Sequence, residues 1–258
     1  MKIIILAGGW GTRLGRQTVD IPKPMVKIGR RPVLWHIMKI FSHYDYKDFI
    51  ISCGVKSHVI KNYFANYQNI NDDFMVDMKN NSIHYHSNYD KEDWRVNIID
   101  TGLNTLKGAR IKRLEKYLDS PVNIVTYGDG LADVDISKLV KFHHSHGKTV
   151  TITGVHPPAR FGEIIEKKSK VVTFQEKPQT SVGLINGGFM VFNENLLDKL
   201  SNNENCDLEK GVLEDLSNEE EVMVFKHDGS WECMDHERDV TYLNNLWENN
   251  NAFWKVWK

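Results

Sequence analysis

A short apolar run followed at once by closely spaced glycines constrains this chain more than any other feature. Residues Ile3–Leu6 are all apolar and predict a buried strand, and the segment Gly8–Gly11 that follows contains three glycines. Because glycine has no Cβ, its backbone can adopt positive φ angles and its N–H groups can approach a bound anion closely. The pair therefore predicts an α/β fold with an anion-binding loop at the end of a strand.

Polar and cationic residues beyond the glycines are suited to phosphate oxygens. Thr12 supplies a hydroxyl group and Arg13 supplies a guanidinium group, both of which bind phosphate well. Lys23 then stands between Pro22 and Pro24, whose fixed φ angles restrict the backbone around it. We therefore expect this part of the chain to hold a polyphosphate.

Two well-known glycine loops fit this segment less well. The dinucleotide-binding fingerprint needs a third glycine where this chain has Leu14, and Gly15 comes one residue late. A P-loop ends in Gly-Lys-Ser/Thr, which is missing here. An ordinary tight turn remains an alternative for the glycines alone, but Arg13 and Lys23 favour phosphate binding.

Segments with strand-like and helix-like patterns alternate along the chain. The expected strands are residues 2–7, Asp48–Cys53, Val122–Tyr127 and Thr149–Val155. The expected helices begin near Val33, at Ser57 as the N-cap, after the N-cap Asp135 as Ile136–His146, and at Val240 as Val240–Asn249. This alternation predicts a doubly wound, mostly parallel sheet that binds ligands at the carboxyl ends of its strands.

Residues 66–97 depart from this pattern. They are rich in Asn, Asp, Lys and His, have weak periodicity, and predict an insertion of loops and short strands. A structureless loop of this length is unusual in a compact domain, so we expect the insertion to be functional or to contact another subunit. The 258 residues otherwise suffice for a single domain, 1–258, with a large core.

Charge and cysteine content restrict the partners and the compartment. A formal net charge of −1 argues against a nucleic-acid-binding protein held by bulk electrostatics. Cys53, Cys206 and Cys233 are odd in number and far apart, which favours a reduced, cytoplasmic compartment. The apolar start is too short for a signal peptide and no run approaches a membrane span, so no membrane partner is expected.

Several motifs together resemble those of the sugar-1-phosphate nucleotidylyltransferases. These enzymes join a nucleoside triphosphate to a sugar 1-phosphate and release pyrophosphate. The similarity covers nearly the whole chain and is carried by Leu6–Leu14, Pro22–Met25, Tyr127–Gly130, Phe174–Pro178, Asn186–Phe189, Met234–Asp235 and Phe253–Trp257. The last two motifs and Leu34–Met38 resemble the glucose-1-phosphate cytidylyltransferase branch in particular.

The resemblance implies a Rossmann-like nucleotidyltransferase fold with a β-rich insertion and C-terminal helices. It implies transfer of a cytidylyl group from CTP to a sugar 1-phosphate, α-D-glucose 1-phosphate first of all, by Mg²⁺-assisted direct displacement. The products would be CDP-glucose, for bacterial surface polysaccharide, and pyrophosphate. Because this branch is similar to hexameric enzymes, the chain is expected to be a homo-oligomer.

Site residues also follow from the resemblance. Arg13, Lys23, Asp129 and Lys177 are expected to be catalytic, and Asp129 and Asp235 to hold the metal, since Mg²⁺ prefers carboxylate and phosphate oxygens. Nucleotide binding is assigned to Leu6, Ala7, Gly8, Gly9, Trp10, Gly11, Thr12, Arg13, Lys23, Thr105, Arg110 and Gly128. Binding of the sugar phosphate is assigned to Glu176, Lys177, Asn186 and Gly187.

Alternatives stay open for several of these residues. Asp235 also fits a helix N-cap before Glu237, and Arg110 fits either a ligand of the base carbonyl or a phosphate, or the first basic residue of a helix around Ile111–Leu118. His143, His144 and His146 lack partners at zinc spacing and are expected to be solvated or capping residues.

Three alternative functions also remain. The first is the same chemistry with another phosphorylated acceptor, or with UTP or dTTP. The second is a metal-dependent glycosyltransferase that uses Asp133 and Asp135. The third is a nucleotide-sensing regulatory protein.

Overall fold

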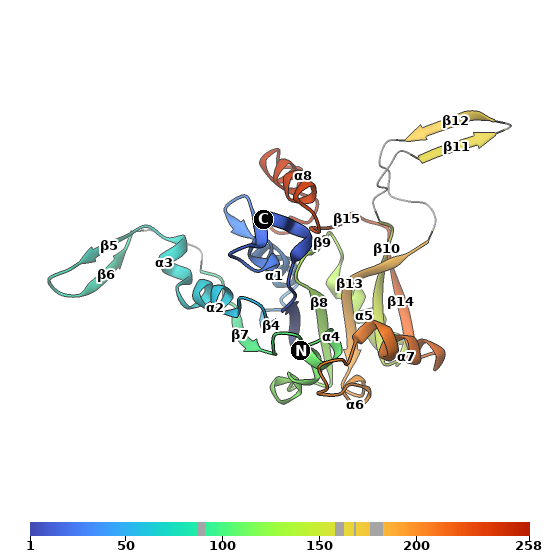
Figure 1. Ribbon diagram of the computed structural model, residues 1–258, viewed down its shortest axis with the longest axis horizontal. Coiled ribbons are helices and arrows are strands. Elements are labelled where there is room, and N and C mark those ends of the chain that lie inside the picture. The colour runs from blue at the N-terminus through green and yellow to red at the C-terminus, as the bar shows by residue number, and fades with distance from the viewer. Residues whose placement is uncertain (87–90, 158–162, 168, 176–182) are drawn as a thin grey trace.

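A mixed sheet runs through the centre of the molecule (Figure 1). The computed structural model describes residues 1–86, 91–157, 163–167, 169–175 and 183–258. Within these residues the central sheet has seven strands in the order β14-β10-β13-β8-β1-β4-β7. The strands are β1 (Ile3–Ala7), β4 (Asp48–Cys53), β7 (Arg95–Asp100), β8 (Val122–Tyr127), β10 (Val150–Val155), β13 (Ile185–Asn193) and β14 (Val222–His227).

Parallel pairing dominates this sheet. Strand β13 runs antiparallel to both β8 and β10, whereas the other neighbouring strands are parallel. The expected mostly parallel α/β sheet is therefore confirmed, with one reversed strand in its interior. The reversed direction of β13 was not visible in the hydrophobic pattern, because a buried strand reads the same way in either direction.

The strand β1 is buried on both faces, which explains its continuous apolar sequence. Its side chains alternate between two cores: Ile3 and Ile5 pack in one, and Ile4 and Leu6 pack in the other. All four side chains are at most 9% exposed. Strand β1 thus contributes side chains to the hydrophobic cores on both faces of the sheet.

Helices cover both faces of the sheet. The first core contains residues of α1 (Val33–His43), α2 (Ser57–Ala65), α5 (Ile136–His146) and α8 (Glu237–Glu248). The second core contains residues of α4 (Lys107–Lys112), α6 (Leu196–Lys199), the π-helical segment η4 (Leu208–Leu213) and α7 (Glu214–Asn218). Short 3₁₀ helices are η1 (Thr12–Thr18), η2 (Lys23–Met25) and η3 (Glu115–Tyr117).

Two hairpins project from the body in opposite directions (Figure 1). One consists of β5 (Phe74–Asp77) and β6 (Ser82–Tyr85) and follows α3 (Tyr67–Asn71). The other consists of β11 (Glu163–Lys167) and β12 (Lys170–Gln175). The first hairpin confirms the β-rich character expected for 66–97, but the end of that range overlaps β7, where Arg95 pairs with Asp48.

Smaller ribbons complete the fold. Strand β9 (Gly130–Ala132) pairs with β15 (Trp231–Cys233), and β2 (Lys27–Ile28) pairs with β3 (Arg31–Pro32). The helices α6, α7 and α8 lie in the C-terminal part of the described chain, as the resemblance implied. Among the described residues, no helix combines the length and the apolar character needed to cross a membrane.

Helix boundaries agree with the sequence where a local cap exists. Asp135 caps α5 as expected, because its carboxylate accepts a hydrogen bond from the Lys138 N–H group at 2.9 Å. Ser57 is not the cap of α2: that position belongs to Lys56, with a positive φ of 55°. The helix expected around Ile111–Leu118 is instead α4, which ends at Lys112, followed by the separate turn η3.

The packing of β13 against α1 generates a stability prediction. Phe189 is fully buried, and its ring centroid lies 5.7 Å from that of Phe41. The substitution Phe189→Ala removes this ring and leaves a cavity, so we expect a loss of roughly 3–5 kcal/mol in the free energy of unfolding. Urea unfolding measures it, with Val224→Ala as the control, because Val224 is 44% exposed. Equal losses in the two variants would contradict this packing.

Candidate functional site

Two loops meet at the same edge of the central sheet. The glycine loop (Gly8–Gly11) follows β1, and the segment Gly128–Asp129 follows β8. The two strands are parallel neighbours, with Leu6 paired to Tyr127, and the Gly128 N–H group donates to the Leu6 carbonyl at 3.1 Å. The sheet therefore holds both loops at the carboxyl ends of adjacent strands, where the fold class predicted them.

A cavity of about 680 Å³ opens over this edge. Its lining includes every residue expected to bind the nucleotide, together with Asp129, Asn186 and Asp235. Gly187 lies beside it, and its carbonyl accepts a hydrogen bond from Trp231 Nε1 at 2.8 Å. Glu176 and Lys177 lie outside the described residues. The structure thus brings together most of the site that the sequence indicated.

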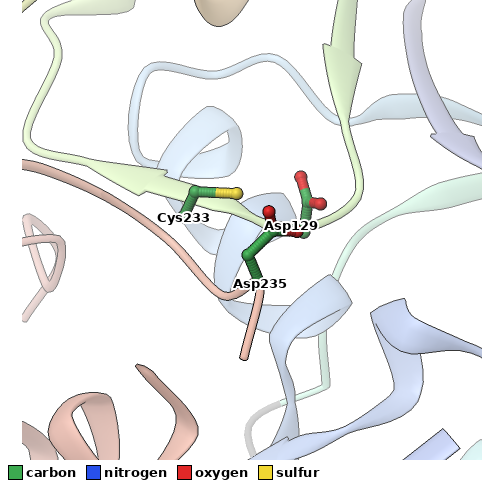
Figure 2. A group of neighbouring side chains, drawn as sticks. All are labelled: Asp129, Cys233 and Asp235. Carbon is green, nitrogen blue, oxygen red and sulfur yellow. The ribbon is translucent and has the colours of Figure 1, made fainter. Parts of the chain in front are cut away.

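A short backbone ribbon joins the two acidic residues. In the β9–β15 pair, Gly130 lies opposite Cys233, and the Met234 N–H group donates to the Asp129 carbonyl at 2.9 Å. This pairing brings Asp129 and Asp235 together (Figure 2). One potential ligand atom from each of Asp129, Cys233 and Asp235 lies within 4.8 Å of the others. No motif in the sequence pointed to Cys233 as a neighbour of these two carboxylates.

Lys23 lies between the two carboxylates. Its ammonium group donates to Asp129 Oδ2 at 2.6 Å and also to Asp235 Oδ1. The Arg13 guanidinium contacts the other oxygen of Asp235. Since the Lys23 side chain is only 12% exposed, these contacts hold a partly buried charge among opposite charges.

The ion cluster of Lys23, Asp129, Asp235 and Arg13 keeps Lys23 and Asp235 charged. Burial opposes the charge on Lys23, but the charge and hydrogen bond of Asp129 and the hydrogen bond of Asp235 outweigh it and raise the Lys23 pKa. Burial likewise opposes ionisation of Asp235, but the hydrogen bond and charge of Lys23, helped by Arg13, lower the Asp235 pKa. Lys23 and Asp235 therefore stay ionised throughout the neutral pH range.

The donor set fits a hard divalent cation. Mg²⁺ is usually bound by one or two carboxylates together with phosphate oxygens and water. Asp129 and Asp235 offer such a pair, and both line the cavity that contains the glycine loop. Asp235 is not the N-cap of α8, because that position belongs to His236, which forms a capping box with Asp239.

Arg110 belongs to α4 and is only 4% exposed. Its guanidinium donates to the carbonyls of Gly8 at 3.0 Å, Cys53 at 3.0 Å and Gly102 at 2.9 Å. These carbonyls follow or end β1, β4 and β7, so Arg110 ties together three strand ends beneath the glycine loop. A contact between Arg110 and the nucleotide stays a prediction.

The carboxylates of the glycosyltransferase alternative have structural partners. Asp133 Oδ1 accepts hydrogen bonds from His227 Nε2 at 2.9 Å and from the Ser230 N–H group at 2.8 Å. Asp135 caps α5. These contacts orient Asp133 and Asp135 toward neighbouring backbone and His227, which weakens the case for a metal site on them.

The histidine expectation needs a correction. His143 is buried rather than solvated, and it bonds Thr151 at 2.8 Å and Asn193 at 3.1 Å between α5 and the sheet. Among the described residues, the group at Asp129 is the one cluster of potential metal ligands. The sequence pattern did not indicate the burial of His143.

A larger cavity, of about 910 Å³, lies elsewhere, beside Trp35, Trp247 and Trp257. It contains none of the residues expected to bind the nucleotide, the sugar phosphate or the metal. Cavity size alone would therefore not have pointed to the residues that the motifs indicate. The residues that sequence reasoning missed in the smaller cavity include Lys107 and Trp231, neither of which carries a local motif.

The glycine loop generates a matched pair of substitutions. A Cβ atom on Gly8 would lie 2.2 Å from Arg110 Nη1, whereas a Cβ atom on Gly9 would meet nothing within 4 Å. We expect Gly8→Ala to lower the free energy of unfolding by about 1–3 kcal/mol, and Gly9→Ala to change it by less than about 1 kcal/mol. Thermal unfolding without nucleotide measures both, and equal effects would refute the buried position of Arg110.

A buried carboxyl group on β15 makes stability depend on pH. Burial raises the pKa of Glu232 to about 7 from an ordinary 4.5. The folded chain therefore favours the protonated form, and the stability this group contributes below pH 4.5 is lost as pH rises through 7. We expect Glu232→Gln to remove this loss.

The pH effect is measured by comparing melting temperatures at pH 5 and pH 8. The stability advantage of Glu232→Gln over the natural chain should be larger at pH 8 than at pH 5. The difference should be on the order of 2 kcal/mol in the free energy of unfolding, or about 5 °C in melting temperature. A constant difference between the two proteins would show that Glu232 titrates normally.

Known proteins match the whole chain. The family model described as nucleotidyl transferase matches residues 2–255. A glucose-1-phosphate cytidylyltransferase from Salmonella typhimurium is 46% identical over 259 residues, and a probable glucose-1-phosphate cytidylyltransferase from Bacillus subtilis is 35% identical over 257 residues. Both alignments cover 100% of each chain.

Solved structures share the fold. The crystal structure of HddC from Yersinia pseudotuberculosis has a TM-score of 0.66 at 22% identity, covering 95% of this chain and 99% of that one. A UDP-glucose pyrophosphorylase complexed with UDP-glucose has a TM-score of 0.68 at 14% identity, covering 96% and 98%. The expected Rossmann-like nucleotidyltransferase fold is thus confirmed. Given the family match and the full-length identities, this chain belongs to the nucleotidyl transferase family and is an enzyme of that type.

Proposed function

We propose that this enzyme transfers a cytidylyl group from CTP to α-D-glucose 1-phosphate and forms CDP-glucose and pyrophosphate. The observation that carries the proposal is the convergence of Lys23, Asp129 and Asp235 on the glycine-lined cavity. The 46% identity to a glucose-1-phosphate cytidylyltransferase along the whole chain supports cytidine and glucose as the substrates.

The reaction demands that two anions approach each other. A phosphate oxygen of the sugar phosphate attacks the α-phosphorus of CTP, a new P–O bond forms, and pyrophosphate leaves. Such transfers need alignment and charge neutralisation more than covalent catalysis. The N–H groups of the glycine loop align the triphosphate, and Arg13 and Lys23 neutralise its charge.

Asp129 and Asp235 would hold Mg²⁺ at the phosphates. When bound, Mg²⁺ supplies Lewis-acid stabilisation of the negative charge that develops on the transferred phosphoryl group. The two side chains come from segments that the β9–β15 ribbon holds in register, so their separation is fixed by the backbone. Lys23 supplies a second positive charge at the same place.

Binding of the other parts of the substrates follows the cavity lining. The backbone of Leu6–Gly8 and Gly128 is proposed to contact the cytosine and its ribose. Thr105 and Arg110 are proposed to contact the nucleotide, Arg110 at the base carbonyl or at a phosphate. Asn186 and Gly187 are proposed to contact the sugar, with Glu176 and Lys177 at its phosphate and hydroxyl groups. Lys177 is also proposed to be catalytic.

The assembly is proposed to be a cytoplasmic homo-oligomer, with a hexamer as the expected form. Part of the 66–97 segment, the β5–β6 hairpin, would make contacts between subunits. Its exposed apolar side chains include Met75, Val76 and Met78. Apolar groups exposed together on a projecting hairpin favour association with another surface.

The product would supply sugars for bacterial surface polysaccharide.

The decisive experiment measures pyrophosphate release with Mg²⁺ across CTP, UTP and dTTP and several sugar 1-phosphates. CTP with glucose 1-phosphate should give the highest kcat/KM. Asp129→Asn and Asp235→Asn should each lower kcat by at least about 100-fold, because each removes a charge at the transition state. Asp135→Asn is the matched control and should keep its activity, since Asn caps a helix as well as Asp.

Other outcomes would redirect the assignment. Turnover with UTP or dTTP but not with CTP would overturn the choice of cytidine. Release of a nucleoside diphosphate in place of pyrophosphate would identify a glycosyltransferase. Nucleotide binding without any turnover would identify a sensor.

A further inference from the structure

A chain of hydrogen bonds runs along one wall of the cavity and joins four segments. It consists of Lys107 at the start of α4, Glu209 in η4, Tyr127 at the end of β8, and Asn186 in β13. Lys107, Tyr127 and Asn186 line the cavity, whereas Glu209 reaches it only through its neighbours. The chain therefore links the nucleotide side of the cavity, at α4, to the proposed sugar side, at Asn186.

The direction of each hydrogen bond follows from the groups involved. Glu209 Oε1 accepts from the Tyr127 hydroxyl and from Lys107 Nζ, the latter at 2.5 Å. Burial and the adjacent Glu209 raise the pKa of Tyr127, so its phenol keeps its proton. Because that single proton is donated to Glu209, the Tyr127 oxygen is left only as an acceptor toward Asn186.

Asn186 is held at both ends of its carboxamide. Its Nδ2 donates to the Tyr127 hydroxyl at 3.1 Å, and its Oδ1 accepts from the Gly188 N–H group at 2.9 Å. Gly188 has a φ of +89°, and a Cβ atom there would lie 2.6 Å from Tyr127 Cδ2, so the tyrosine ring packs directly on this turn. The carboxamide retains a second lone pair on Oδ1 that can accept from a sugar hydroxyl.

We propose that Glu209 and Tyr127 are positioning residues that fix the orientation of the Asn186 carboxamide and thereby set the affinity for the sugar 1-phosphate. Without the acceptor at Glu209, the Tyr127 proton can turn toward Asn186, which reverses the polarity of that contact and favours the flipped amide. The proposal rests on the proposed function, since it takes Asn186 as a sugar ligand. It adds two residues that act on the substrate through another side chain.

Kinetics of four variants test the proposal. Tyr127→Phe removes the acceptor of Asn186, and Glu209→Met removes the acceptor of Tyr127. Each should raise KM for glucose 1-phosphate by about three- to tenfold, the range expected for one neutral hydrogen bond. KM for CTP should stay within about twofold. Glu209→Gln keeps an acceptor oxygen and should rescue most of the loss, and Glu219→Met is the control.

Glu219 is a suitable control because it also pairs with a lysine, Lys199 Nζ, at 2.8 Å, but without a tyrosine and away from the cavity. Its substitution should leave both KM values unchanged. If Glu209→Gln and Glu209→Met lose affinity equally, the acceptor at Glu209 does not matter and the proposal fails. An equal rise of KM for CTP and for glucose 1-phosphate would indicate a general loss of structure and would also overturn it.

A double-mutant cycle separates this proposal from the function on which it depends. In an Asn186→Ala background, Tyr127→Phe and Glu209→Met should cause no further rise in KM for glucose 1-phosphate. A further rise of the same size would mean that they act independently of Asn186. If Asn186→Ala alone has no effect on this KM, the proposed sugar site itself is wrong.

Binding of the product CDP-glucose and of its fragment CDP gives a second measurement that does not require turnover. Calorimetry of CDP-glucose and of CDP yields the contribution of the glucose moiety as the dissociation constant for CDP divided by that for CDP-glucose. This ratio should fall about three- to tenfold in Tyr127→Phe and Glu209→Met, with CDP binding unchanged. A ratio equal to that of the natural chain would overturn the proposal.

Discussion

The attraction between Lys23 and the carboxylates of Asp129 and Asp235 is the interaction on which the site depends. With ligand atoms within 4.8 Å of each other, the two negative charges would repel by about 3 kcal/mol at the effective dielectric of a protein surface. The ammonium group of Lys23 offsets this repulsion, and the two carboxylates in turn raise the pKa of Lys23 and keep it charged. The folded protein thus already places one cation, the Lys23 ammonium, between the two carboxylates. Binding of a metal–triphosphate complex would rearrange the contacts among these charged groups.

The sheet supplies the rigidity that such an ion cluster needs. The parallel pairing of β1 with β8 holds the glycine loop next to Gly128, and Arg110 ties the ends of β1, β4 and β7 together from below. Its buried guanidinium finds its partners in backbone carbonyls, which fix the loops more firmly than flexible side chains would. The loops of the site are therefore held by hydrogen bonds within the protein itself, as expected of a preorganised electrostatic site.

Features with local signals could be predicted from the sequence. The apolar run of β1, the cap at Asp135 and the glycine loop each depend on neighbouring residues, and all lie where expected. The closeness of Cys233 to Asp129, and the link from Tyr127 to Glu209, depend on the pairing of distant segments and leave no periodic pattern. The π-helical turn η4 is similar, since Gly211 interrupts its helical dihedral angles. Motif similarity bridged such gaps for Asp235 but gave no role to Glu209.

The β9–β15 ribbon joins positions about 100 residues apart, since it pairs Gly130 with Cys233 and Ala132 with Trp231. Ribosomes make the chain from its N-terminus, so the glycine loop and Asp129 emerge long before Asp235 does. The nascent protein therefore cannot assemble its ion cluster until Asp235 has left the ribosome. Shortened products of translation that stop before Asp235 therefore contain the glycine loop and Asp129 but lack the second carboxylate of the cluster.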